Sequence, residues 1–207
     1  TDISKHKNTY HSTSYFSASS KYDFFGGYDR GKRCGIIHVA DHNVSVGKKM
    51  FTWGYNQLSR SWGGALTDTD GTYCELMAGS YSNSQPDFTF IEPYETKCFS
   101  QYWYPIADLG NATYANLFAA VRLEKGVLKV QPTSAYKNVK ITLRSEGKEI
   151  FSTFSDLTPG SVAAFEVPDY SEDCFDITLG SILHFEMRRK TEKRTPVLFP
   201  EVPFPKE

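Results

Sequence analysis

The second half of the chain carries the feature that most limits its fold: short alternating apolar runs that recur at regular intervals. Turn residues separate the runs, as at Glu146-Gly147-Lys148 and Pro159-Gly160. Short strands at this spacing are typical of an antiparallel β-sandwich. The expected strands lie at residues 117–123, 127–131, 138–145, 149–156, 161–167, 175–179 and 183–188. We therefore expect a small immunoglobulin-like sandwich over residues 117–190.

The first half has a different texture, with longer loops and more aromatic residues. Its expected strands lie at residues 33–40, 48–53, 72–78 and 96–104. Residues 1–20 are rich in Ser, Thr, Lys and His and predict an extended arm or loop, and residues 54–64 predict a second loop. The run Asp68-Thr69-Asp70-Gly71 is a strong turn signal. Helical periodicity is not convincing anywhere, so the sequence predicts an all-β fold.

The change of texture predicts a domain boundary near residue 116. Residues 1–116 would form one β domain and residues 117–190 the second. The last thirteen residues contain four prolines, so residues 191–207 predict an extended linker or tail. Because the chain begins without Met and ends in this tail, we expect it to be a piece of a longer protein.

The charge balance excludes some classes of partner. The chain has 23 Lys and Arg against 24 Asp and Glu, which gives a net charge of -1. Such a chain lacks the strongly basic surface that nucleic acid requires. No apolar run approaches the roughly 18 residues of a membrane span. We expect neither a nucleic-acid partner nor a membrane span.

The four cysteines are spaced too irregularly for a zinc ribbon or a redox motif. Three of them fall inside apolar runs, where a buried free thiol is the ordinary state. We expect free thiols at Cys34, Cys74, Cys98 and Cys174.

Glu75 is the most informative candidate for catalysis. It stands between Cys74 and Leu76 in an expected strand. A buried carboxylate without partners is costly, and its raised pKa would suit a general base. The alternative is that Glu75 faces solvent or pairs with a nearby Arg or Lys.

Two histidines near the end of the first expected strand are weaker candidates. His38 and His42 flank Asp41, and together they offer three candidate ligands, two imidazoles and a carboxylate, of kinds that suit divalent ions. They lie on opposite sides of a turn, so a hydrogen-bonded structural role is favoured for each. We expect no bound metal ion and no cofactor.

Tyr and Trp suit surfaces that are apolar and wet at once, which includes carbohydrate sites. Aromatic residues make up 15% of the chain. Sugar rings stack on aromatic side chains, while their hydroxyl groups bond to amides, carboxylates and guanidinium groups. For each Trp, packing in the core is the alternative. The expected sugar-binding residues are Trp53, Arg60, Trp62, Gln85, Asp87, Gln101 and Trp103.

Residues 23–104 contain a series of motifs that resembles a bacterial family of uncharacterised proteins. The motifs are FGGYD at 25–29, HVADH at 38–42, GKKMFTWG at 47–54, YCELMAG at 73–79, QPD at 85–87 and QYWYPI at 101–106. In that family the region is a domain of unknown function, often followed by tetratricopeptide repeats. The resemblance implies further domains of the parent chain upstream and such repeats downstream.

The unknown domain in turn looks like the galactose mutarotase-like supersandwich. The resemblance implies that residues 1–116 are the C-terminal part of such a supersandwich, with Glu75 as a base and a histidine as the acid. Mutarotases carry Glu-Pro-Gln where this chain has Glu75-Leu76-Met77. The histidine that acts as the acid would lie in a segment upstream of Thr1. Otherwise His38 or His42 would take that role.

Two functions follow from these features. The first is a domain that binds or processes carbohydrate, with proton transfer at an anomeric centre as the reaction if it is catalytic. The second is a non-catalytic interaction module of a scaffold protein. An enzyme should bring Glu75 and a His to one cavity, whereas a scaffold should leave Glu75 solvated or paired.

Overall fold

A computed structural model describes residues 3, 5–84 and 87–189 of the chain. Within them the predicted all-β fold is confirmed, because strands form four antiparallel sheets. The predicted tail at residues 191–207 lies outside the described residues. The strands are β1 (Thr13–Phe16), β2 (Phe24–Asp29), β3 (Cys34–Val39), β4 (Gly47–Thr52), β5 (Cys74–Gly79), β6 (Tyr102–Ala107), β7 (Tyr114–Ala115), β8 (Ala119–Glu124), β9 (Val127–Pro132), β10 (Tyr136–Ser145), β11 (Lys148–Leu157), β12 (Ala163–Glu166), β13 (Cys174–Leu179) and β14 (Leu183–Arg188).

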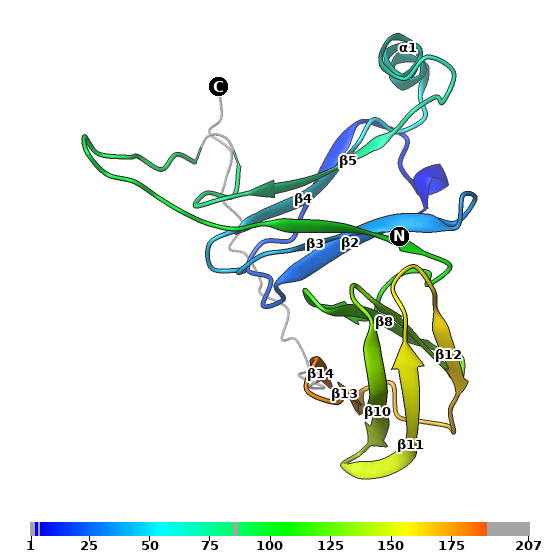
Figure 1. Ribbon diagram of the computed structural model, residues 1–207. Helices are drawn as coiled ribbons and strands as arrows, with labels where there is room; N and C mark the ends of the chain where they lie inside the picture. Colours follow the sequence, from blue (N-terminus) through cyan, green and yellow to red (C-terminus); the bar gives the residue numbers. More distant parts are fainter. Residues whose placement is uncertain (1–2, 4, 85–86, 190–207) are drawn as a thin grey trace, which may run out of the picture.

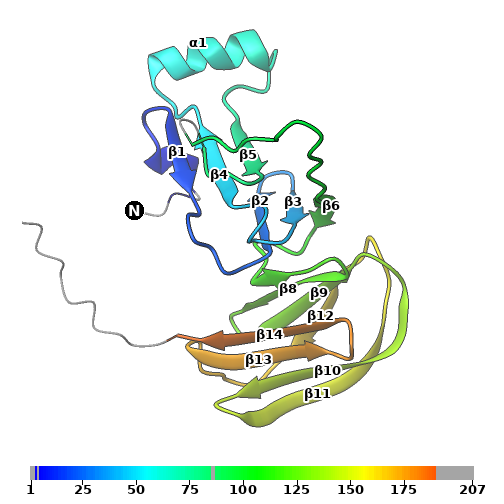
Figure 2. The ribbon, with the colours of Figure 1, turned by 90° about the vertical axis from the view of Figure 1, so that its left-hand side faces the viewer.

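The sheets are stacked as four layers (Figure 1, Figure 2). Sheet A has the order β1-β4-β5 and sheet B the order β2-β3-β6. Sheet C follows with the order β12-β9-β8-β7, and sheet D has the order β11-β10-β13-β14. We call sheets A and B the N-lobe and sheets C and D the C-lobe.

The main hydrophobic core lies between sheets C and D. Alternate residues of their strands point into it, as period-two side-chain geometry requires. The fully buried members include Val121, Leu128, Leu143 and Ile177. This core gives the C-lobe the sandwich that its alternating sequence predicts.

A second, smaller core joins the two lobes. Ile37 and Val39 of β3 and Ile106 of β6 pack with Leu109, Ala115 and Ala120. Ala120 lies on the face of β8 opposite to the main core, so sheet C is covered on both sides. The Gln131 side chain also accepts a hydrogen bond from the Ala107 amide across this junction. Sheet B is thereby fixed to sheet C.

Sheets A and B face each other less closely. A side chain at Gly27 would meet Leu76 of β5, which places the Leu76 face of sheet A against sheet B. A cleft of about 910 Å³ opens between the two sheets, and Met50, Leu76 and Trp103 line part of it. The outer face of sheet A, which carries Phe51 and Glu75, points away from sheet B.

The expected loop at residues 54–64 is wrong, because the chain forms α1 (Gln57–Leu66) there. Asn56 caps the helix by accepting a hydrogen bond from the Ser59 amide at 2.8 Å. Gly63 is buried where a side chain would meet the backbone of Gly71. The two glycines at 63–64 hide the helix in the sequence, although they lower helix propensity without forbidding it. A three-residue 3-10 turn, η1 (His6–Asn8), is the other helical element among the described residues.

Three strands of the N-lobe differ from expectation. The expected arm at residues 1–20 contains β1, which pairs with β4, a partner that local patterns do not reveal. β2 was not expected at all. The expected strand at 96–104 begins only at Tyr102 and runs through Pro105, which is tolerated because β6 is an edge strand.

All four cysteines are free, as expected. The expectation that they are buried is wrong for Cys34, Cys74 and Cys98, which are exposed. Cys34 and Cys74 each begin a strand, and Cys98 precedes β6, so all three lie at the ends of the apolar runs.

Candidate functional site

Glu75 lies on the outer face of sheet A. In the pairing of β4 with β5 it stands opposite Phe51, and side chains of Trp53 and Tyr73 share this face by alternation. Glu75 is half-buried, and its carboxylate makes no hydrogen bond or ion pair with any residue that the structure describes. We call Phe51, Trp53, Trp62, Tyr73 and Glu75 the outer aromatic face.

Trp62 reaches this face from α1. Its ring stacks on Trp53 with centroids 5.6 Å apart and planes at 23°. The Phe51 ring packs edge-on against the Trp53 ring, with centroids 5.0 Å apart. Trp53 and Trp62 thus lie side by side, and about half of Trp62 remains exposed to solvent.

Arg60 and Asp87 do not join the outer aromatic face through any recorded contact. The Arg60 guanidinium donates from Nε to the Tyr55 carbonyl at 3.2 Å. Asp87 is exposed in the segment between β5 and β6. Gln85 lies outside the described residues.

His38 lies on the other side of sheet A, between the two sheets of the N-lobe. The register places Phe25, His38 and Trp103 directly opposite one another on β2, β3 and β6. The His38 ring lies 5.0 Å from the Phe25 ring and 4.6 Å from the Trp103 ring. His38 is fully buried, and within the described ranges neither ring nitrogen has a hydrogen-bond partner.

The surroundings of His38 favour its neutral form. Burial lowers the pKa of His38; the Gln101 side chain opposes this shift and the Lys48 ammonium adds to it. Gln101 itself donates to the Ala78 carbonyl and to the Ser80 hydroxyl, each at 3.0 Å. Gln101 and Trp103 thus hold the N-lobe together, and sheet A separates them and His38 from Glu75.

His42 lies at a third place, beside a cleft at the junction of the two lobes whose wall includes its partner Asp23. Its Nδ1 is 2.7 Å from Oδ1 of Asp23, which also accepts a hydrogen bond from the His42 amide. Asp41 follows β3 and accepts hydrogen bonds from the backbone and side chain of Asn43. Sequence reasoning missed Asp23, although it immediately precedes β2 and pairs with Ala40 just after β3.

This junction cleft has a volume of about 570 Å³. That size lies within the range of small-molecule sites. Carboxylates and aromatic rings lie together in its wall. The lining residues used below are Asp23, Asp41, Phe99, Tyr102, Tyr114 and Phe118.

A buried lysine lies near the two carboxylates of the cleft. Lys48 is almost fully buried and donates from Nζ to the Tyr22 carbonyl. Burial lowers the pKa of Lys48, and Asp23 and Asp41 oppose the shift. Burial alone would raise the pKa of Asp23, but hydrogen bonds from His42 and the charge of Lys48 hold it below its usual value.

Asp23, Asp41 and His42 are close enough together to hold an ion, with donor atoms within 4.8 Å of one another. This group differs from the expected His38, Asp41 and His42, because His38 points between the sheets. Oδ1 of each Asp already accepts protein hydrogen bonds, and Lys48 supplies positive charge nearby.

The predicted catalytic residues are therefore distributed over three places. Glu75 lies on the outer aromatic face, His38 between sheets A and B, and His42 beside the junction cleft, where it is bonded to Asp23. The structure does not bring Glu75 and His38 to one cavity, and Glu75 is absent from the lining of the junction cleft. Among the described residues no helix is long and apolar enough to span a bilayer.

Comparison with known families matches both lobes separately. Residues 114–180 match the model of the YphG-like protein, second domain. No solved structure matches the chain. Residues 1–106 match the DUF5107 family, described as a domain of unknown function. This match includes β1 to β5 and most of β6 and covers just over half of the chain, so the protein belongs to the DUF5107 family.

Proposed function

We propose that this protein binds carbohydrate in the junction cleft without transforming it. The observation that carries the proposal is that Asp23 and Asp41 share one cleft with the rings of Tyr102 and Phe118. A sugar presents hydroxyl donors on its rim and an apolar C–H face. Carboxylates and aromatic rings match these two surfaces.

The free carboxylate oxygens are the acceptors in this proposal. Oδ1 of Asp23 and of Asp41 accepts hydrogen bonds from the protein, whereas neither Oδ2 has a hydrogen-bond partner among the described residues. Sugar hydroxyls would donate to these Oδ2 atoms, and bonds to charged acceptors contribute about 1.5–3 kcal/mol each. The lowered pKa keeps Asp23 ionised as an acceptor at neutral pH.

Aromatic side chains would supply the apolar contact. Tyr102 and Phe118 are each about half exposed, so their faces are open to a ligand. Asn116 is not a free ligand group, because its Nδ2 donates to the Ile182 carbonyl and its Oδ1 accepts from the Phe118 and Ala119 amides. Asn116 instead holds the loop that presents Phe118.

The resemblance to mutarotases supplies the finer part of the proposal. It would make residues 1–116 part of a mutarotase-like supersandwich, with Glu75 as base. The separation of Glu75 from His38 and His42 favours binding over proton transfer at an anomeric centre. Upstream domains and downstream tetratricopeptide repeats in a parent protein rest on the resemblance alone.

We also propose a two-domain division of the chain. The matched segments end at 106 and resume at 114, and β7 at Tyr114–Ala115 pairs with β8 of sheet C. These features support a boundary within residues 107–113, slightly before the one expected at 116. The two four-stranded sheets support an immunoglobulin-like description of the C-lobe.

The test is calorimetric titration of the 207-residue chain with a panel of neutral saccharides. Asp41→Asn and Tyr102→Ala should each weaken binding by about 10-fold or more, because each removes one of the two matched surfaces. Asp169→Asn and Phe154→Ala are matched controls, since both residues are exposed on the C-lobe away from the cleft. Binding that survives both cleft substitutions would overturn the proposal.

A non-catalytic interaction module is the second candidate function. Its specific support is the large exposed apolar surface of the N-lobe around α1 and in the segment before β6. If no saccharide binds, this second function replaces the first.

A further inference from the structure

Helix α1 exposes a continuous apolar stripe. Leu58, Trp62 and Leu66 are spaced four residues apart, which places them on one face of the helix. Their exposed fractions are 67%, 46% and 51%. Trp62 is anchored on Trp53 by one ring face, so the stripe is held in position although nothing covers it.

The segment between β5 and β6 exposes a second apolar surface. We call residues 87–97 the arm. Phe88, Phe90, Ile91 and Tyr94 are between 64% and 107% exposed. Lys97 ties the arm together by donating to the Phe90 carbonyl and to the Thr89 hydroxyl, and no residue of the arm belongs to a strand. The arm is thus shaped by its own contacts while its apolar side chains point to solvent.

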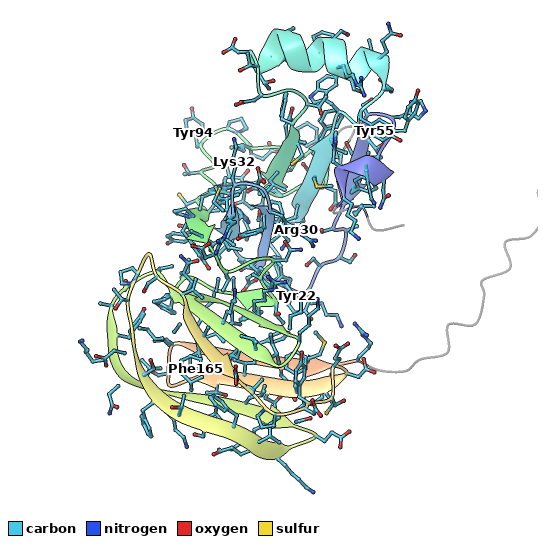
Figure 3. The ribbon with its side chains drawn as sticks, turned by 90° about the vertical axis from the view of Figure 1, so that its right-hand side faces the viewer. Tyr22, Arg30, Lys32, Tyr55, Tyr94 and Phe165 are labelled. Carbon is cyan, nitrogen blue, oxygen red and sulfur yellow. The ribbon has the colours of Figure 1, made fainter. Side chains whose placement is uncertain are left out.

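The two surfaces lie at opposite ends of one strand. α1 precedes β5 in the chain and the arm follows it, and Figure 1 shows them extending in different directions beyond sheet A. Figure 3 shows Tyr55, just before α1, and Tyr94 of the arm on opposite sides of the N-lobe. One copy therefore does not bring its own arm onto its own helix.

The charges of the two surfaces are complementary. Arg60 is the only charged residue of α1. The arm carries three carboxylates, on Asp87, Glu92 and Glu95, against the single lysine Lys97. An acidic arm and a basic helix attract each other. A contact between the arms of two copies, or between their α1 helices, would instead place like charges together.

We propose that two copies of this chain form a two-fold dimer in which each arm covers the α1 stripe of the other copy. Two different patches on one chain, each meeting its complement on the partner, satisfy the reciprocity of an isologous interface. The dimer would bury the arm side chains on Leu58, Trp62 and Leu66 and bring Arg60 to the carboxylates of the arm. The proposal does not depend on the sugar cleft, because Asp23, Asp41 and Tyr102 belong to neither surface.

The test is sedimentation equilibrium of the full chain with three variants. Phe90→Asp alters the arm and Leu58→Asp alters the helix, and each should weaken the dimer by about 10-fold or more by placing a carboxylate in an apolar contact. Phe154→Asp is the matched control, since Phe154 is 60% exposed on the C-lobe, and it should dimerise like the wild type. Circular dichroism checks that each variant keeps its β structure.

Mixing the two disrupted variants gives the sharpest result. The arm variant keeps an intact helix and the helix variant keeps an intact arm, so a mixed dimer retains one of the two contacts. The mixture should therefore contain more dimer than either variant alone at the same total concentration. A monomeric wild type, unchanged dimerisation of both variants, or a mixture no better than its parts would each overturn the proposal.

Discussion

The two lobes differ in where they keep their apolar residues. Sixteen of the nineteen exposed large hydrophobic side chains among the described residues lie at or before Trp103. Of the twenty buried hydrophobic residues in the described part of the chain, only Ile37, Val39 and Ala40 belong to that stretch. The C-lobe is thus organised around its own core, and the N-lobe is organised around surfaces.

This contrast separates stability from function. A strand that alternates toward one core is stabilised by apolar burial, which is roughly proportional to area. The N-lobe lacks such a core, and its buried apolar residues lie mainly where sheet B meets sheet C. We infer that the C-lobe stabilises the N-lobe, while the N-lobe provides most of the contact surfaces.

The largest expected effect is on the C-lobe core. Leu143→Ala should lower the free energy of unfolding by about 2–5 kcal/mol, because the side chain is fully buried between sheets C and D. Urea unfolding measures the change. Phe154→Ala, at an exposed position of β11, is the control and should change stability by less than about 0.5 kcal/mol.

A substitution at the junction should separate the lobes. Ile37→Ala should destabilise the N-lobe by about 2–4 kcal/mol, because Ile37 is buried in the small core between sheets B and C. Hydrogen exchange should then accelerate in β2, β3 and β6 and stay slow in β10 and β13. Equal acceleration in both lobes would show that the lobes unfold as one unit.

A smaller effect should follow pH through His38. Its pKa is lowered in the folded state by burial, so folding disfavours its protonated form. The N-lobe should have its full stability above the unfolded-state value of about 6.5 and lose part of it as pH falls below that value. Thermal unfolding of the wild type and of His38→Gln across this range measures the effect, and the variant should lose this component of the pH dependence.

The smallest effect should be at the start of α1. Asn56→Ala removes the acceptor for the Ser59 amide and should cost about 1 kcal/mol of local helix stability. Exchange of the Ser59 amide should accelerate while β10 is unchanged. Gln57→Ala leaves the cap intact and should leave that amide protected.

The same contrast explains how much of the fold could be predicted from the sequence. In the C-lobe each strand alternates toward one core, so the hydrophobic pattern alone predicted the bounds of β8 to β14 to within a few residues. In the N-lobe the hydrophobic pattern is weak because both faces of the sheets carry aromatic side chains. There β1 depends on its partner β4, and α1 depends on the Asn56 cap and on close packing at Gly63.

The candidate site could be predicted only in part. His42 was identified in the HVADH segment, but its partner Asp23 lies nineteen residues earlier and meets it only because β2 pairs with β3. Leu117 and Phe118 join the cleft from the far side of the expected domain boundary. Glu75 and His38 are each where a strand was expected, but strand alternation and the order of the sheets place sheet A between them.

The most direct test of the central claim is to map saccharide binding by NMR on the full chain. The three tryptophan indole signals report on the outer aromatic face through Trp53 and Trp62, and on the space between the sheets through Trp103. On addition of a saccharide that binds, we expect the amide signals of Asp41, Tyr102 and Phe118 to shift, and the indole signals of Trp53 and Trp62 to stay in place. Shifts confined to those two indoles and to the Glu75 amide would contradict the account and move the site to the outer face of sheet A.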